Sequence, residues 1–186
     1  ILEVKISLLF IIEQKTNIKN MQEDYNQLLN FKVSKLNTFA LFCLNDLSSR
    51  GKRGKNIGRE DYSINEAYSL IFENDEGERL GNYINQVTGI NNKIQSIHIV
   101  NYPEGGKSFP HRDTNTSNTA IFLLENCDEG GNLEIYDSGK WNTVKMNTPG
   151  DWVYFDGSKY QHRVTEVKKG TRKVLVVWFE KNKDFI

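Results

Sequence analysis

From about residue 90 onward, short apolar runs alternate with turn signals. The runs are Ile94 to Tyr102, Thr119 to Leu124, Leu133 to Tyr136, Trp152 to Phe155 and Lys173 to Phe179. Between them lie Pro103 to Gly106, Asp128 to Gly131, Asp137 to Gly139, Pro149-Gly150 and Asp156-Gly157. Strands that recur at this spacing, with turns of this composition, are typical of a β-sandwich or a jelly-roll barrel. We therefore expect a mainly β, α+β fold in which residues 91–186 form the barrel.

The first 90 residues have a different pattern. Apolar residues recur at helical spacing in Gln22 to Phe31 and in Ile64 to Val87, with a break expected at Asp75 to Gly77. The first dozen residues and Leu36 to Leu44 are rich enough in β-branched or aromatic residues to be strands, but the pattern does not settle their structure. We see no linker or repeat. The prediction is one domain, residues 1–186, in which residues 1–90 supply helices packed outside the barrel and loops on the substrate side.

Charge and composition exclude several classes of partner. The 24 Lys and Arg residues balance the 24 Asp and Glu residues, so no bulk attraction to nucleic acid or to an anionic membrane is expected. The basic stretch Arg50 to Lys55 is interpreted as a flexible, solvated loop. The apolar run Ile6 to Ile12 is far shorter than the ~20 residues that cross a bilayer.

The two cysteines, Cys43 and Cys127, have no metal-binding or disulfide spacing, and we expect free thiols in a reducing, cytoplasmic setting. No secretory signal is expected either, because the apolar run lacks a small-residue cleavage site. The first residue is Ile1 rather than Met, which suggests that sequence upstream was removed or not included.

Three side chains in the barrel region have the chemistry of a metal site. His111 and Asp113 are two residues apart, so in an extended segment their side chains share one face. His162 is a third candidate ligand on a later strand that could lie beside the first. Two imidazoles and one carboxylate form the facial triad of non-haem Fe(II) oxygenases. The remaining histidine, His98, lies within a strand and is interpreted as structural.

Arg172 begins the last apolar run and adds a fourth candidate. Arg172, Val174, Val176 and Trp178 share one face of this predicted strand, and Lys173, Leu175, Val177 and Phe179 share the other. Both faces are mostly apolar, as expected when one lines a barrel and helices cover the other. A buried arginine is costly unless it is paired. The distal carboxylate of a 2-oxo acid is a suitable partner, since guanidinium groups bind carboxylates bidentately.

Four segments together resemble the 2-oxoglutarate- and Fe(II)-dependent dioxygenases, in particular the prolyl-4-hydroxylase-like branch. They are Tyr102 to Asp113, Glu129 to Ile135, Asn147 to Phe155 and His162 to Phe179, about half of the chain. The resemblance implies a distorted double-stranded β-helix with N-terminal helices against its larger sheet.

The resemblance also implies roles for individual residues. His111, Asp113 and His162 are the expected iron ligands, and with Arg172 they form the expected catalytic set. Arg172 is expected to bind the far carboxylate of 2-oxoglutarate, while Tyr102 and Trp178 are expected beside the co-substrate. Two other branches fit less well, because nucleic-acid demethylases need a second arginine at the position of Trp178 and halogenases lack the acidic ligand. Leu123 replaces a tyrosine with which some relatives contact the co-substrate.

The implied activity is hydroxylation of a C–H bond, with release of succinate and CO2 from 2-oxoglutarate. The implied cofactors and co-substrates are Fe(II), 2-oxoglutarate and O2, with ascorbate as an optional reductant. A proline-containing peptide or protein is the preferred substrate, and a free amino acid or another small molecule is the alternative. A non-catalytic, cupin-like module that binds a metal or another ligand is a further alternative; Arg172 argues against it.

Overall fold

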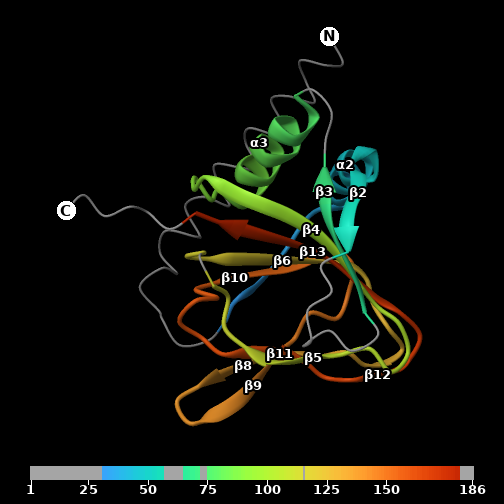
Figure 1. Ribbon diagram of the computed structural model, residues 1–186, viewed down its shortest axis with the longest axis vertical. Coiled ribbons are helices and arrows are strands. Elements are labelled where there is room, and N and C mark those ends of the chain that lie inside the picture. Colours follow the sequence, from blue (N-terminus) through green and yellow to red (C-terminus); the bar gives the residue numbers. More distant parts are fainter. Residues whose placement is uncertain (1–30, 57–64, 72–74, 115, 181–186) are drawn as a thin grey trace, which may run out of the picture.

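The computed structural model describes residues 31–56, 65–71, 75–114 and 116–180, which form two facing antiparallel sheets (Figure 1). The large sheet has the order β1 (Val33–Lys35), β10 (Asp151–Phe155), β6 (Thr119–Glu125), β13 (Arg172–Phe179), β4 (Ile94–Tyr102), β3 (Glu66–Ile71) and β2 (Lys52–Asn56). The small sheet has the order β5 (Ser108–His111), β11 (His162–Val164), β8 (Leu133–Asp137) and β9 (Lys140–Val144). A short pair, β12 (Val167–Lys169) with β7 (Glu129–Gly130), lies at one end.

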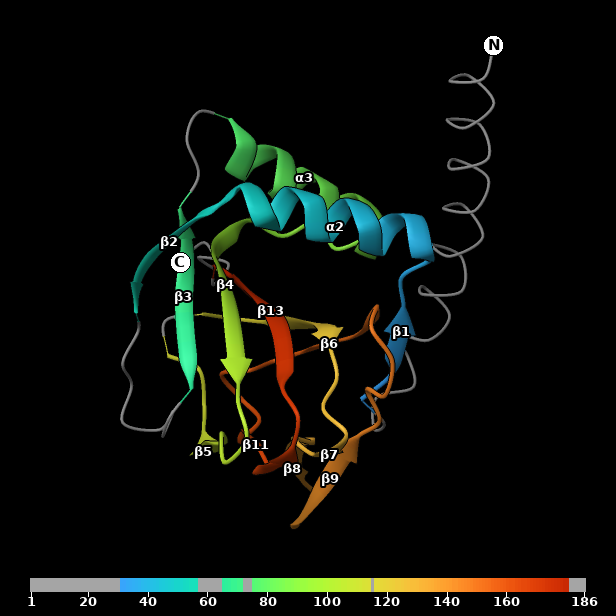
Figure 2. The same ribbon diagram turned by 90° about the vertical axis from the view of Figure 1, so that its right-hand side faces the viewer.

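Two helices, α2 (Thr38–Arg50) and α3 (Glu76–Thr88), cover the face of the large sheet that points away from the small sheet (Figure 2). The side chain of Asn37 caps α2 by accepting a hydrogen bond from the backbone N–H of Ala40 at 2.8 Å. Helix α3 ends at Gly89, whose φ of 70° is left-handed and suits glycine. Within the described part of the chain, neither helix combines the length and the apolar character needed to cross a membrane.

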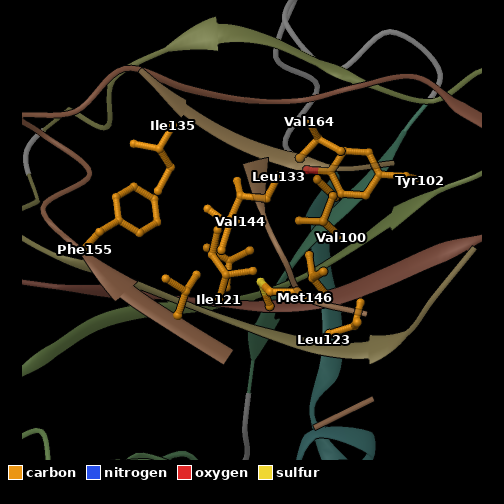
Figure 3. Packing of buried hydrophobic residues seen from close by; sticks show 14 of the residues in the cluster. Val100, Tyr102, Ile121, Leu123, Leu133, Ile135, Val144, Met146, Phe155 and Val164 are labelled. Atoms are coloured by element: carbon orange, nitrogen blue, oxygen red, sulfur yellow. The ribbon is translucent and has the colours of Figure 1, made fainter. Parts of the chain in front are cut away.

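The alternating residues of β13 divide the interior into two apolar layers. Val174, Val176 and Trp178 belong to the cluster between the two sheets, which also contains residues from β4, β6, β8, β9, β10 and β11 (Figure 3). Leu175 and Phe179 belong to the second cluster, which lies between the large sheet and the helices. The predicted parity of this strand is therefore confirmed. It also explains why the strand is apolar on both faces.

Two expectations for the N-terminal region are wrong, and one segment that the sequence left undecided is resolved. Leu36 to Leu44, where a strand was left open, leads into helix α2, and residues 66–71, assigned helical spacing, form β3. The basic stretch from Arg50 to Lys55 is the end of α2 and most of β2, which pairs with β3. Pairing with a neighbouring strand decided the two segments that became β2 and β3: β3 adds to β4, with Ala67 opposite Val100. Ile6 to Ile12 and nearly all of Gln22 to Phe31 lie outside the described residues.

The other predicted elements are found with small changes. Helix α3 begins directly after Asp75, where a break was expected, and it buries Leu80 and Ile84. All five predicted apolar strands of the barrel region are present, and so are the short strands β5 and β11 that were expected at the candidate ligands. The sequence did not indicate β7, β9 and β12. Cys43 and Cys127 are free thiols, as predicted.

Candidate metal centre and co-substrate end

The structure brings the three predicted metal ligands together. Strands β5 and β11 are antiparallel neighbours in which His111 lies directly opposite His162. The Nε2 atoms of His111 and His162 lie 4.0 Å and 3.8 Å from the two carboxylate oxygens of Asp113. One ligand atom from each residue can be chosen so that all three lie within 4.8 Å of one another. Two imidazoles and a carboxylate at this spacing can hold one divalent cation from three sides.

Backbone contacts orient both imidazoles in the same way. Nδ1 of His111 lies 2.7 Å from the carbonyl oxygen of Phe109, and Nδ1 of His162 lies 3.0 Å from that of Tyr160. A carbonyl oxygen only accepts, so each Nδ1 carries the proton and each Nε2 presents its lone pair toward Asp113. Phe155 packs edge-on against the ring of His162, with ring centroids 5.0 Å apart. The tautomers are thus those that a metal requires.

Asp113 is buried, and hydrogen bonds hold both its side chain and its backbone. The hydroxyl of Thr119 donates to Oδ2 at 2.5 Å, and the backbone N–H of Asp113 donates to the carbonyl oxygen of Gly157 at 2.9 Å. The other oxygen, Oδ1, is buried without a hydrogen-bond partner among the described residues. A buried, unsatisfied carboxylate oxygen is costly, and a cation at this position would compensate for it.

The structure also identifies two supporting residues that the sequence did not indicate. Thr119 is the first residue of β6, and Gly157 lies in the turn before β11. A Cβ atom on Gly157 would overlap the carboxylate of Asp113 and the hydroxyl of Thr119. Asp156 keeps this turn closed by accepting hydrogen bonds from the backbone N–H groups of Ser158 and Lys159. The turn itself was visible in the sequence, but its contact with Asp113 depends on the fold.

Replacing Thr119 with valine is expected to weaken metal binding while the fold is kept. The two side chains have similar volumes, but valine cannot donate to Asp113 Oδ2. Loss of a group that orients a ligand typically lowers metal affinity by about 10–100-fold. Titration with Mn(II) or Fe(II) under anaerobic conditions checks this. Thr143→Val, at an exposed position of β9, is the matched control, and equal metal affinities for both variants would contradict the prediction.

Replacing Gly157 with alanine is expected to displace Asp113 because no space exists for the added methyl group. Overpacking of this kind costs about 1–3 kcal/mol of stability. The Tm should fall and metal binding should weaken. For comparison, a Cβ on Gly81 in α3 would come no closer than 3.4 Å to its nearest neighbour. Gly81→Ala should therefore leave the Tm unchanged or raised, because alanine favours helix. An unchanged Tm and metal affinity for Gly157→Ala would exclude the close contact.

Arg172 lies at the start of β13, on the inner face of the large sheet, and only 2% of it is exposed. Its Nε has no hydrogen-bond partner among the described residues, and its Nη1 donates to Asn126 Oδ1 at 3.3 Å. Burial lowers the pKa of the guanidinium, while the neighbouring Tyr102 and Cys127 act in the opposite direction. Within the described ranges no carboxylate forms an ion pair with Arg172. Its charge is therefore available to an anionic ligand.

Tyr102 and Trp178 lie at different ends of this inner face. Tyr102 is directly opposite Arg172 in the β4–β13 pair, and both side chains are buried. Trp178 is opposite Thr119, at the end of β13 where the metal ligands are supported. His98 packs edge-on against Trp178, with ring centroids 4.3 Å apart, and is not part of the metal cluster. Leu123, where some relatives have tyrosine, is fully buried in the apolar cluster.

Comparisons with known proteins agree with this arrangement. Residues 97–180 match the family model of the 2OG-Fe(II) oxygenase superfamily. A 2OG-Fe(II) oxygenase family oxidoreductase from Burkholderia pseudomallei superimposes with a TM-score of 0.64 at 14% identity, covering 86% of this chain and 90% of that chain. A Pseudomonas putida prolyl-4-hydroxylase gives 0.56 at 16% identity, covering 86% and 96%. No curated protein sequence matches the chain.

A third solved structure is a prolyl hydroxylase from Trichoplax adhaerens in complex with a peptide fragment of a hypoxia inducible factor oxygen degradation domain. It has a TM-score of 0.59 at 16% identity, covering 92% of this chain and 93% of that chain. At these identities the solved structures establish the fold, which is the predicted distorted double-stranded β-helix. The family match spans β4 to β13, including all three candidate ligands and Arg172. The comparisons therefore agree with the predicted resemblance: residues 97–180 match the 2OG-Fe(II) oxygenase superfamily, and the chain shares the fold of solved members of that class.

Proposed function

We propose that the protein hydroxylates a C–H bond of a peptidyl proline, with conversion of 2-oxoglutarate and O2 to succinate and CO2. The observation that carries this proposal is the presence, inside one barrel, of a His–Asp–His cluster and a buried arginine without an acidic partner among the described residues. A metal-binding scaffold would need the first feature but has no use for the second, which costs stability.

The residues at the cluster fit Fe(II). Two neutral imidazoles and one carboxylate are the ligand set of non-haem Fe(II) oxygenases, and Asp113 Oδ1 is buried and unsatisfied without a cation. His111, Asp113 and His162 would hold the metal. When bound, the iron supplies the oxidising chemistry by activating O2 together with the 2-oxo acid.

The chain's own contribution is to bind, orient and shield the reactants. The backbone carbonyls behind His111 and His162 keep each Nε2 aimed at the metal position. Arg172 would hold the distal carboxylate of 2-oxoglutarate, and Tyr102 lies beside it. The interior between the two sheets is apolar, with buried Val174, Val176 and Ile121, which would limit the access of water from that side.

Support for a peptide substrate comes from the fold neighbours. Two of those described above are prolyl hydroxylases, and one was solved with a peptide. A fourth neighbour is a viral collagen prolyl hydroxylase from Paramecium bursaria Chlorella virus-1, with a TM-score of 0.51 at 13% identity, covering 80% of this chain and 95% of that chain. The net charge of zero is also compatible with a peptide better than with a nucleic acid.

The test is succinate formation from 2-oxoglutarate in the presence of Fe(II), ascorbate and air, with and without a library of proline-containing peptides. A peptide that stimulates turnover and gains about 16 Da, one oxygen atom, supports the proposal and identifies the motif. Slow turnover that no peptide stimulates would leave the enzyme class intact and point to a free amino acid or another small molecule. No turnover by iron-loaded protein would contradict the proposed activity and favour a binding module.

A further inference from the structure

Asn126 links the buried Arg172 to a surface loop. Its Oδ1 accepts a hydrogen bond from Arg172 Nη1 at 3.3 Å, and its Nδ2 donates to the carbonyl oxygen of Asn147 at 3.0 Å. The guanidinium can only donate and the carbonyl can only accept, so these two neighbours fix the orientation of the amide. A residue on the turn after β6 therefore holds one nitrogen of the arginine in a defined direction.

The loop on the far side of Asn126 is itself rigidly held. Asp151 Oδ2 accepts hydrogen bonds from the backbone N–H groups of Asn147 and Thr148, both at 2.9 Å. The N–H of Gly150 donates to the carbonyl oxygen of Leu123 on β6 at 2.8 Å. The carbonyl that receives Asn126 Nδ2 is thus part of a closed turn. The link from Asp151 through Asn147 and Asn126 gives Arg172 a fixed support.

The chemical identity of the support matters because Asn126 is neutral. A carboxylate at this position could also orient the guanidinium, but it would cancel the charge that an anionic ligand needs. An amide orients the group and leaves its charge uncompensated. Arg172 Nε is buried and has no partner among the described residues, so the guanidinium has a donor available after Asn126 has taken Nη1.

We infer that Asn126 is a positioning residue for the co-substrate: it aims the Arg172 guanidinium at the distal carboxylate of the 2-oxo acid, and its neutrality preserves the affinity for that carboxylate. The inference rests on the proposed role of Arg172 in holding 2-oxoglutarate. It adds a determinant of 2-oxo acid binding that lies outside the barrel strands, on a turn whose exposed side chain was not indicated by the sequence.

Two variants of Asn126 distinguish its effect on the orientation of the Arg172 guanidinium from its effect on the charge of that group. Asn126→Asp keeps the shape and places a carboxylate against Arg172, so affinity for 2-oxoglutarate should fall by roughly 100-fold, in the range of losing one charged partner at a buried pair. Asn126→Ala removes the support but leaves the charge, so a fall of about 10-fold is expected. Asn82→Asp, on an exposed position of α3, is the matched control for the added charge.

Binding is measured by calorimetry on Mn(II)-loaded protein without O2, with 2-oxoglutarate and with oxalate as separate probes. Oxalate can chelate the metal but has no distal carboxylate, so its affinity should be unchanged in both Asn126 variants. Kinetics with Fe(II) should show a raised KM for 2-oxoglutarate and little change in kcat. Wild-type affinity of Asn126→Asp for 2-oxoglutarate would overturn the inference, and so would equal weakening of 2-oxoglutarate and oxalate.

Failure of this inference can be distinguished from failure of the proposed function by adding Arg172→Met to the same series. If Arg172→Met loses 2-oxoglutarate binding and the Asn126 variants do not, only the role of Asn126 is wrong. If Arg172→Met binds 2-oxoglutarate like the wild type, the proposed role of Arg172 is wrong, and the inference about Asn126 falls with it.

Discussion

Replacement of Arg172 with methionine is expected to raise the stability of the protein and to abolish its response to 2-oxoglutarate. Arg172 is 2% exposed and has no acidic partner among the described residues, so its charge is desolvated without compensation. Burial accordingly lowers its pKa. Replacing buried charged groups with apolar residues of similar volume is often neutral or stabilising by about 1–4 kcal/mol. The Tm of the metal-loaded variant without co-substrate should therefore equal or exceed that of the wild type.

The same substitution, although it should not lower the stability, is expected to weaken the binding of 2-oxoglutarate. Removing one partner of a buried charged pair typically costs about 2–5 kcal/mol of binding, which is roughly 30-fold to several thousand-fold in affinity. Addition of 2-oxoglutarate should raise the Tm of the wild type but not that of Arg172→Met. Thermal denaturation with and without 2-oxoglutarate, in the presence of Mn(II), measures both effects in one experiment.

Arg163→Met is the matched control for this experiment. Arg163 lies on β11 and is partly exposed; it pairs with Glu134 at 2.7 Å and stacks on Trp141 with its guanidinium carbon 4.3 Å from the ring centroid. Its loss should slightly lower the Tm and leave the response to 2-oxoglutarate intact. An Arg172→Met protein that is markedly less stable than the wild type, or that keeps the wild-type response, would show that the arginine has a structural partner instead of a ligand.

Replacement of Asp113 with alanine is expected to remove metal binding and to lower turnover by three orders of magnitude or more, about 4 kcal/mol of activation free energy. Asp113 supplies the only carboxylate of the cluster, and its oxygens lie 3.8 Å and 4.0 Å from the two imidazole nitrogens. Without it, two neutral imidazoles remain. These cannot balance the charge of a divalent cation in a buried site.

In the absence of metal, the same substitution is expected to stabilise the protein. Asp113 Oδ1 is buried without a hydrogen-bond partner among the described residues, so alanine relieves an electrostatic cost while losing the contact with Thr119. The wild type should gain stability on addition of metal, about 2.7 kcal/mol at 100 times the Kd. Asp113→Ala should gain nothing under the same conditions.

Metal-dependent Tm measurements and succinate release check the Asp113 prediction together. Asp128→Ala is the control, because this carboxylate is exposed and forms an ion pair with the surface residue Lys169, at 3.5 Å. The control should show the wild-type metal response and turnover. A metal-induced rise in the Tm of Asp113→Ala equal to that of the wild type would mean that the cation binds elsewhere.

The local pattern of the sequence was sufficient for the elements of the barrel. Period-two alternation in Arg172 to Phe179 depends only on the geometry of an extended chain, so both apolar layers followed from the residues themselves. The helix after Asp75 likewise follows from apolar spacing. The residue types at 111, 113 and 162 indicated the chemistry of the cluster before any geometry was known, because few ligand sets combine two imidazoles and a carboxylate.

Features that depend on contacts between segments distant in sequence were determined only by the tertiary structure. Residues 66–71 became a strand because β4 offered an edge with which to pair, and no local pattern contains that information. The alignment of His111 with His162 depends on the register between β5 and β11, which are about fifty residues apart in the chain. The supports of the site, Thr119 and Gly157 at Asp113 and Asn126 at Arg172, are ordinary turn and strand residues by sequence. Side-chain chemistry is thus encoded locally, whereas the burial and orientation that make it useful arise only when the two sheets pack together.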